Sequence, residues 1–212
     1  MRLDHLSFAA GPDGLAATTD RLSELLGEKF HDGGIHPRFG TRNMILPLTQ
    51  GQFIEIVEVL DHPASDKAAF GQAVRARSES GGGWLGWVVA VDDIATVESR
   101  LDRQASPGNR HRPDGVELRW KQIGVESLRA DPQLPFFVEW QSPVEQHPSV
   151  GATGHLELAK VEIAGDAKRV ASWLDTSDEY RIGTFEIGWT PPNGVSGILA
   201  VSVATPDGIV RI

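Results

Sequence analysis

The sequence contains no cysteine among its 212 residues. Disulfides, thiolate metal sites and cysteine nucleophiles are therefore excluded together, and the absence favours a reducing compartment. Long hydrophobic runs are also missing, since no apolar stretch approaches the roughly 20 residues of a membrane helix. The N-terminal stretch MRLDHLSFAA is interrupted by Asp4 and His5, so it resembles a strand more than a signal peptide. We expect a cytoplasmic protein that does not bind membranes.

Basic residues are fewer than acidic ones. The chain has 20 Lys and Arg against 29 Asp and Glu, which gives a net charge of -9 and argues against a surface that binds nucleic acid or anionic lipid. The sequence has no Walker motif, no dinucleotide fingerprint and no GxSxG motif. Its glycine run at 81–83 leads into a strand instead of a helix, so we predict no phosphate cradle there. A small-molecule ligand is the partner that we expect.

Hydrophobic periodicity predicts the same order of elements twice, a strand and a helix followed by extended segments. In the first copy, Asp13 is placed to cap the helix and Gly27 to end it. The expected elements are strands 3–10, 41–48 and 52–60 with helix 13–27, a short linker helix, then strands 84–91, 116–123 and 135–141 with helix 94–101. A third, degenerate copy is expected over 156–205. We therefore predict an internal repeat of roughly 80 residues.

These elements predict an α+β protein in which modules pack together as one domain. The expected parts are a first βαβββ module at 1–60, a helical linker at 61–83, a second βαβββ module at 84–143 and a C-terminal αβ module at 144–212. The third module also permits a homodimer.

Several motifs occur in an order that resembles a known family. They are LDHLSF at 3–8, HPRFGTRNMIL at 36–46, FIEIV at 53–57, LGWVVAVDD at 85–93, LPFFVEW at 134–140 and HPS at 147–149. The chain resembles the vicinal oxygen chelate superfamily, and within it the glyoxalase-like proteins that carry an HPxxGTxN stretch. The resemblance implies paired βαβββ modules whose curved sheets wrap a cup, which often holds a divalent metal.

The family takes its metal ligands from the first and last strands of each module. Aligning LDHLSF with LGWVVA, and FIEIV with FVEWQ, implies His5, Glu55 and Glu139 as ligands, with Trp87 in the fourth place. Tryptophan cannot coordinate a cation, so we expect Trp87 to narrow the cup with its aromatic face. One imidazole and two carboxylates suit Fe, Mn, Mg or Zn as the divalent metal.

Alternation along the strands supports the same three polar residues, because each lies on one face of an otherwise apolar segment. Glu58 has the opposite parity to Glu55, so Glu55 is preferred for the cup. Glu139 is a lone acid among apolar residues, which tends to raise the pKa of a carboxyl group and suits a general acid or base. We predict Glu139 and Glu55 as catalytic residues.

The stretch around HPRFGTRN predicts the rim and wall of the cup. Met44, Leu46 and Leu48 share a face that we expect against helices, which leaves Asn43 for the cavity. A turn at His36 and Pro37 with a purely structural role is an equal alternative. The expected substrate contacts are His36, Thr41, Asn43, Trp87 and Phe137. We expect His36→Ala to weaken ligand binding and to leave thermal stability nearly unchanged.

The basic cluster Arg110, His111 and Arg112 more often forms a solvated loop than an anion site. For the whole chain we predict a protein that binds a small oxygen-bearing metabolite and acts as a metal-dependent lyase, isomerase or dioxygenase. A metal-free small-molecule binding protein without catalysis is the alternative, and a structural or partner-binding role is a third.

Overall fold

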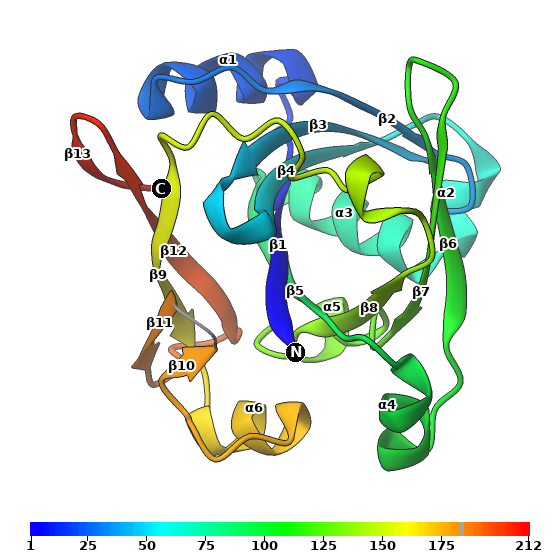
Figure 1. Ribbon diagram of the computed structural model, residues 1–212, viewed down its shortest axis with the longest axis vertical. Coiled ribbons are helices and arrows are strands. Elements are labelled where there is room, and N and C mark those ends of the chain that lie inside the picture. The colour runs from blue at the N-terminus through cyan, green and yellow to red at the C-terminus, as the bar shows by residue number, and fades with distance from the viewer. Residues whose placement is uncertain (183–184) are drawn as a thin grey trace.

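A computed structural model describes residues 1–182 and 185–212. Eight strands of its first two thirds close into a barrel in the order β1-β4-β3-β2-β6-β7-β8-β5 (Figure 1). The strands are β1 (Arg2–Ala9), β2 (His31–His36), β3 (Thr41–Leu48), β4 (Gln52–Val59), β5 (Gly83–Ala90), β6 (Ser106–His111), β7 (Glu117–Ile123) and β8 (Phe136–Trp140). The prediction of an α+β protein is confirmed. Strands β2 and β6 were not predicted, because glycines and polar residues interrupt their pattern.

Each half of the barrel has the same order of elements, a strand, a helix and three more strands. In the first half the helix is α1 (Gly14–Leu26), which ends at Gly27 in the left-handed conformation with φ of 68°, as predicted. Asp13 does not cap α1 with its side chain and pairs with Arg21 instead. In the second half the helix is α4 (Ile94–Leu101), and Asp93 caps it by accepting a hydrogen bond from Ala95 N.

Strand β4 shows how alternation separates the cavity from the outer core. Glu55 lines the barrel interior, whereas Ile54 and Ile56 pack outside with the apolar face of α1. On β3 the same separation holds, because Leu46 and Leu48 join the outer core. Met44 packs against that core as well, and Asn43 bonds to Glu55 inside, so the predicted orientation of this stretch is confirmed.

The remaining helices lie in the linker between the two halves and in the loop before β8. They are α2 (Pro63–Lys67), α3 (Ala69–Glu79) and α5 (Ser127–Ala130), and short 3-10 turns occupy Thr49–Gly51 and Val144–Gln146. Phe70 and Val74 of α3 are buried together, as their spacing predicts. In the described parts of the chain, no helix is long and apolar enough to cross a membrane.

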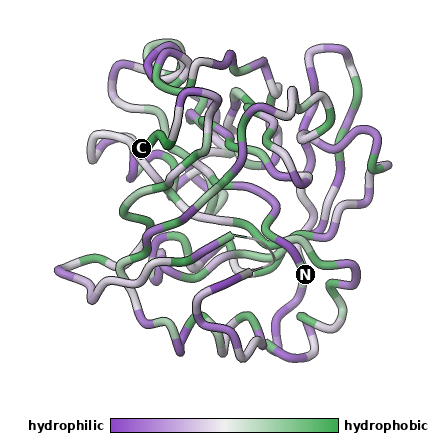
Figure 2. Tube along the Cα trace, turned by 60° about the vertical axis from the view of Figure 1, so that its left-hand side comes forward, coloured by the Kyte–Doolittle hydropathy of each residue, from purple (hydrophilic) through white to green (hydrophobic). Residues whose placement is uncertain are grey.

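The C-terminal segment forms a second sheet in the order β10-β11-β9-β12-β13. Its elements are β9 (Glu157–Ala164), α6 (Ala167–Leu174), β10 (Arg181–Ile182), β11 (Phe185–Thr190), β12 (Gly197–Thr205) and β13 (Gly208–Arg211). The sheet stands beside the barrel in Figure 1, and hydrophobic and hydrophilic stretches alternate along the chain in Figure 2. Trp87 and Phe185 contact each other edge to face between the barrel and this sheet, so both belong to one outer core.

Candidate functional site

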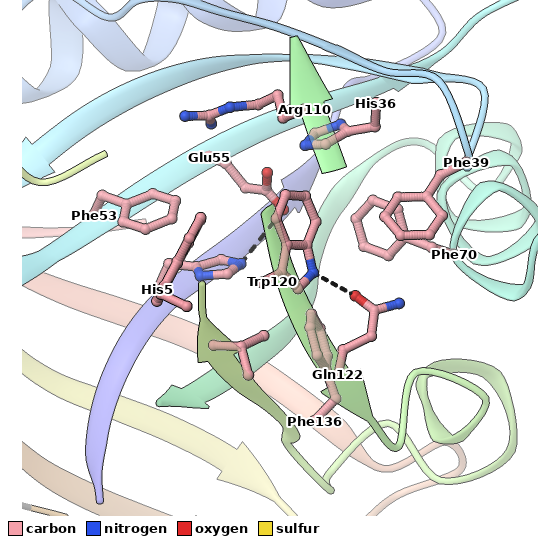
Figure 3. A pocket seen from close by; sticks show the side chains of 12 residues that line it. His5, His36, Phe39, Phe53, Glu55, Phe70, Arg110, Trp120, Gln122 and Phe136 are labelled. Carbon is pink, nitrogen blue, oxygen red and sulfur yellow. Dashed lines mark hydrogen bonds and ion pairs between the residues drawn. The ribbon is translucent and has the colours of Figure 1, made fainter. Parts of the chain in front are cut away.

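The barrel interior contains a cavity whose space, counted together with the solvent at its mouth, is about 440 Å³. Figure 3 shows polar side chains and aromatic rings from several strands that point toward one another across it. The lining residues are His5, His36, Phe39, Phe53, Glu55, Phe70, Arg110, Trp120, Gln122, Phe136, Val138 and Trp140. Five of the barrel strands supply the polar ones, β1, β2, β4, β6 and β7.

Glu55 is a buried carboxylate whose two oxygens are both hydrogen-bonded. Ser7 donates to Oε1 at 2.6 Å and Asn43 donates to Oε2 at 2.7 Å. Burial by itself would raise the pKa of Glu55, but electrostatic interactions with the nearby His5 and His36 rings and the two hydrogen bonds outweigh it and lower the pKa. Glu55 is therefore ionised and held in one orientation.

A second carboxylate, Asp4, organises two histidines at the other side of the cavity. Asp4 accepts hydrogen bonds from His5 Nδ1 at 2.8 Å, from His147 Nε2 at 3.1 Å and from Trp140 Nε1 at 3.2 Å. Burial would raise the pKa of Asp4, but the hydrogen bonds from His147 and His5 dominate and hold that pKa well below its usual range. In the neutral ring, a hydrogen on Nδ1 donated to Asp4 leaves the lone pair on Nε2.

Nε2 of His5 points toward Glu55, whose Oε1 lies 3.8 Å away (Figure 3). The ring is also fixed by stacking on Phe53, with ring centroids 4.4 Å apart. A register shift in the pairing of β1 with β5, between Leu3 and His5, turns Asp4 and His5 toward the same region. The bulge therefore places a carboxylate and an imidazole in one site from consecutive positions.

His36 ends β2 and lies inside the barrel with 5 % of its surface exposed. Its Nδ1 is 3.0 Å from Oγ1 of Thr41, and its ring packs near Phe39, Phe70 and Trp120. Burial is the main reason that the pKa of His36 falls to about 3, so the ring is neutral at physiological pH. His36 is a wall residue of the cavity and not part of a loop.

Arg110 is the cation of the cavity, and the sequence assigned it to a solvated loop. It lies on β6 with 4 % of its surface exposed. No residue in 1–182 or 185–212 forms a hydrogen bond or ion pair with its guanidinium, and its Nε is buried without a partner. Burial lowers the pKa of Arg110 to about 10, which leaves it charged at neutral pH.

The profile of one protein family, described as a glyoxalase-like domain, matches residues 3–177. The chain belongs to the glyoxalase-like domain family. The family resemblance predicted from the motifs is thus confirmed. A search of curated proteins finds no match.

Among solved structures, a hypothetical protein from Staphylococcus aureus is similar over 99 % of this chain and 97 % of its own, with a TM-score of 0.65 and 16 % identity. At that identity the likeness shows the fold alone. Methylmalonyl-CoA epimerase from Mycobacterium tuberculosis aligns with 67 % of this chain and 89 % of its own, at 17 % identity and a TM-score of 0.44. The Streptomyces coelicolor epimerase in complex with 2-nitronate-propionyl-CoA gives a TM-score of 0.44 at 16 % identity, covering 66 % and 96 %.

The glyoxalase-like barrel brings together five of the residues that the sequence singled out. His5, Glu55 and His36 line the cavity, and Asn43 and Thr41 support them from behind. It does not bring Glu139, Trp87 or Phe137 to the same place.

Those three side chains point out of the barrel. Glu139 Oε2 accepts a hydrogen bond from Ile94 N at the start of α4, at 2.8 Å. Trp87 donates from Nε1 to the carbonyl of Gln133, and Phe137 packs against Trp173 of α6. The predicted convergence of His5, Glu55 and Glu139 is therefore wrong.

Strand register explains the error. In the first half, parallel β1 and β4 pair His5 with Phe53 and Ser7 with Glu55. In the second half, parallel β5 and β8 pair Val88 with Phe136 and Ala90 with Val138.

The true counterparts of His5 and Glu55 are thus Val88 and Val138, one residue before or after the predicted ones. A shift of one residue moves every side chain to the other face of a strand. The consecutive phenylalanines 136 and 137 fit either alignment of FIEIV with β8, so the motif alone does not distinguish the two registers.

The corrected register shows which side chains in the cup could donate to a metal. His5 and Glu55 supply two donors, but valines occupy both places that the second half would contribute. In the described residues no group of three histidine, cysteine, aspartate or glutamate side chains is arranged to hold an ion. Catalytic metal sites commonly have three protein ligands. The donor set of this cup therefore does not fit a metal held by the protein.

Sequence reasoning missed part of the polar site, although signals for it were present. Asp4 directly precedes His5, and His147 is the histidine of the HPS motif. Arg110 lay in a stretch where proline and glycine hid β6.

We expect Glu139→Gln to leave ligand binding unchanged and Glu139→Ala to lower the free energy of unfolding by about 1 kcal/mol, the usual cost of losing a helix cap. The reason is that Glu139 bonds to the first turn of α4 and does not reach the cavity. Urea unfolding and a ligand titration measure the two effects. A loss of binding in Glu139→Gln, with unfolding unchanged, would restore Glu139 to the site.

Proposed function

We propose that this glyoxalase-like cup binds a small oxygen-bearing metabolite and that His5 moves a proton at the carbon next to its carbonyl, as an isomerase or lyase does. The observation that carries the proposal is the 2.8 Å contact between Nδ1 of His5 and the buried carboxylate of Asp4. A hydrogen on Nδ1 that is donated to Asp4 leaves the basic Nε2 on the side of the ring toward Glu55, in the lining of the cavity. Positioned general bases of this kind contribute about 100- to 10,000-fold to a rate.

Asp4 and Glu55 support the proton transfer without taking part in it as bases. When Nε2 of His5 accepts the proton from carbon, an imidazolium forms between the two carboxylates. Both carboxylates stabilise that positive charge, as the aspartate of a catalytic triad does. The bond electrons remain on the substrate as an enolate, and return of the proton from His5 completes an isomerisation.

The test is solvent deuterium incorporation into phenylacetone, a neutral aromatic ketone with acidic hydrogens next to its carbonyl. Proton NMR measures the exchange, and quenching of Trp120 and Trp140, which line the cavity, measures binding. Both are recorded with excess chelator. We expect His5→Gln to retain binding and to lose exchange by about 100-fold or more.

His31→Gln is the matched control, because His31 lies in the groove outside the cavity and should leave exchange unchanged. Equal exchange in the His5→Gln variant and the native protein would contradict the proposed base. Loss of native exchange on adding chelator would contradict the metal-free mechanism.

The alternative is a binding protein without catalysis. The observation in its favour is the pair of valines, Val88 and Val138, at the places where the second half would supply polar groups. It predicts quenching of tryptophan fluorescence by phenylacetone with chelator present, and no exchange above the buffer rate.

A further inference from the structure

Arg110 lies where the cavity meets a groove on the outside of the barrel. The groove has an empty volume of about 800 Å³ and shares Arg110 with the lining of the cavity. Its other lining residues are His31, Asp32, Gly33, Arg112, Pro113, Asp114, Glu145, Gln146, His147, Pro148 and Val150. Arg110 is thus a lining residue of both spaces.

We propose that Arg110 binds the carboxylate of the ligand, whose apolar body lies among the aromatic rings of the cup. This inference rests on the proposed function and names the substrate class. A buried guanidinium without an anion is costly, because its lost hydration is not replaced. A planar carboxylate replaces it with two parallel hydrogen bonds.

Among the described residues, none of the neighbouring acidic side chains pairs with the guanidinium of Arg110. Asp114 pairs with Arg112, and Asp32 accepts a hydrogen bond from the backbone of Gly34. Glu55 acts on Arg110 through its charge, and among the described residues the two side chains form no hydrogen bond or ion pair. The guanidinium therefore keeps its hydrogen-bonding capacity for a group from outside the chain.

The backbones of β2 and β6 approach each other closely next to Arg110. Strand β2 approaches β6 where Ile35 pairs with His111. Gly34 allows this approach, because a Cβ at its position would lie 1.9 Å from the carbonyl oxygen of His111. Its φ of 102° is also one that glycine favours. The close approach of β2 to β6 therefore occurs at the residue that follows Arg110.

Charge and shape favour a carboxylate over a phosphate. The site already contains two ionised acids, Asp4 and Glu55, and His36 is neutral. A single guanidinium balances a monoanion better than a phosphate dianion in such surroundings. Rings of Phe53, Phe136 and Trp120 line the space for the body of the ligand, and such faces suit a flat apolar group.

The experiment compares three probes of nearly equal shape, 3-phenylpropionate, its neutral amide and 2-phenylethyl phosphate. Tryptophan quenching gives Kd for the native protein, Arg110→Gln and Arg112→Gln. We expect native protein to bind the carboxylate about 10- to 100-fold tighter than the amide, as one charged bidentate contact allows. Arg110→Gln should lose that preference and still bind the amide, and Arg112→Gln should keep it, because Arg112 is only partly buried and is already paired with Asp114.

Thermal unfolding without ligand separates binding from a structural role. Removing an unpaired buried charge should raise the melting temperature of Arg110→Gln or leave it unchanged. A lower melting temperature together with a retained carboxylate preference would overturn the inference.

Equal affinity of native protein for carboxylate and amide would overturn the inference and leave the proposed function standing. Tighter binding of the phosphate would overturn the choice of a carboxylate. Binding of none of the three would contradict both this inference and the proposed function.

Discussion

Replacing Asp4 by alanine is expected to lower the free energy of unfolding by about 3 kcal/mol, because buried donors lose their shared acceptor. Asp4 is fully buried, and its carboxylate receives hydrogen bonds from His5, His147 and Trp140. Those residues come from β1, from β8 and from the segment after β8. The carboxylate therefore joins segments far apart in the sequence as well as orienting His5.

Urea unfolding at neutral pH measures the effect, and Asp13→Ala is the matched control. Asp13 is a half-exposed acid that pairs with Arg21 on the surface, so its loss should cost less than about 1 kcal/mol. Asp4→Ala should also abolish proton exchange with phenylacetone, since His5 would lose the group that fixes its tautomer. A cost at Asp4 as small as that at Asp13 would contradict the network.

The second large expected effect comes from His36. Because of this residue, the free energy of unfolding should fall when the pH is lowered to mildly acidic values. The pKa of His36 is about 3 in the folded protein, chiefly because of burial, against 6.5 when the side chain is free. Between those values the unfolded chain binds a proton that the folded chain does not, so stability falls as pH falls. From about pH 7.5 to about pH 5, His36 alone should remove about 2 kcal/mol.

His36→Gln should reduce this pH dependence by the same amount, and the exposed His155→Gln should leave it unchanged. Asp4 and Glu55 also have lowered pKa values, from 3.8 and 4.5. Their stabilisation is present above those values and is lost only at lower pH, so it does not enter this range. Urea unfolding at the two pH values tests the expectation, and equal slopes for native protein and His36→Gln would refute it.

The same burial corrects an expectation from the sequence. His36→Ala was expected to leave thermal stability nearly unchanged, as for a rim residue. His36 is instead packed near three aromatic rings and bonded to Thr41, so truncation should leave a cavity and cost stability.

Local patterns predicted much of the barrel and one half of its site. Alternation along β4 placed Glu55 inside and preferred it to Glu58, which bonds to Arg42 and to Leu15 N on the outside. Glu55 and Asn43 were placed well because their motifs lie in strands β4 and β3, which pair in one continuous register. Family membership was also predictable, since several motifs occurred in the family's order.

The other half of the site depends on register and on long-range contacts. A shift of one residue in β5 and β8 exchanged Val88 for Trp87 and Val138 for Glu139. The sequence did not predict that Arg110 is buried. Its strand β6 has no apolar alternation, and it joins the barrel through long-range pairing with β2. Composition alone cannot show that a guanidinium in a basic stretch is buried.

The most direct test of the account is the position of 3-phenylpropionate in a crystal of the native protein grown with chelator. The account predicts electron density in the cup, with the carboxylate bonded to the guanidinium of Arg110 and the ring among Phe53, Phe136 and Trp120, within reach of His5 Nε2. A cup that holds only water at saturating ligand, with the probe elsewhere on the surface, would contradict it.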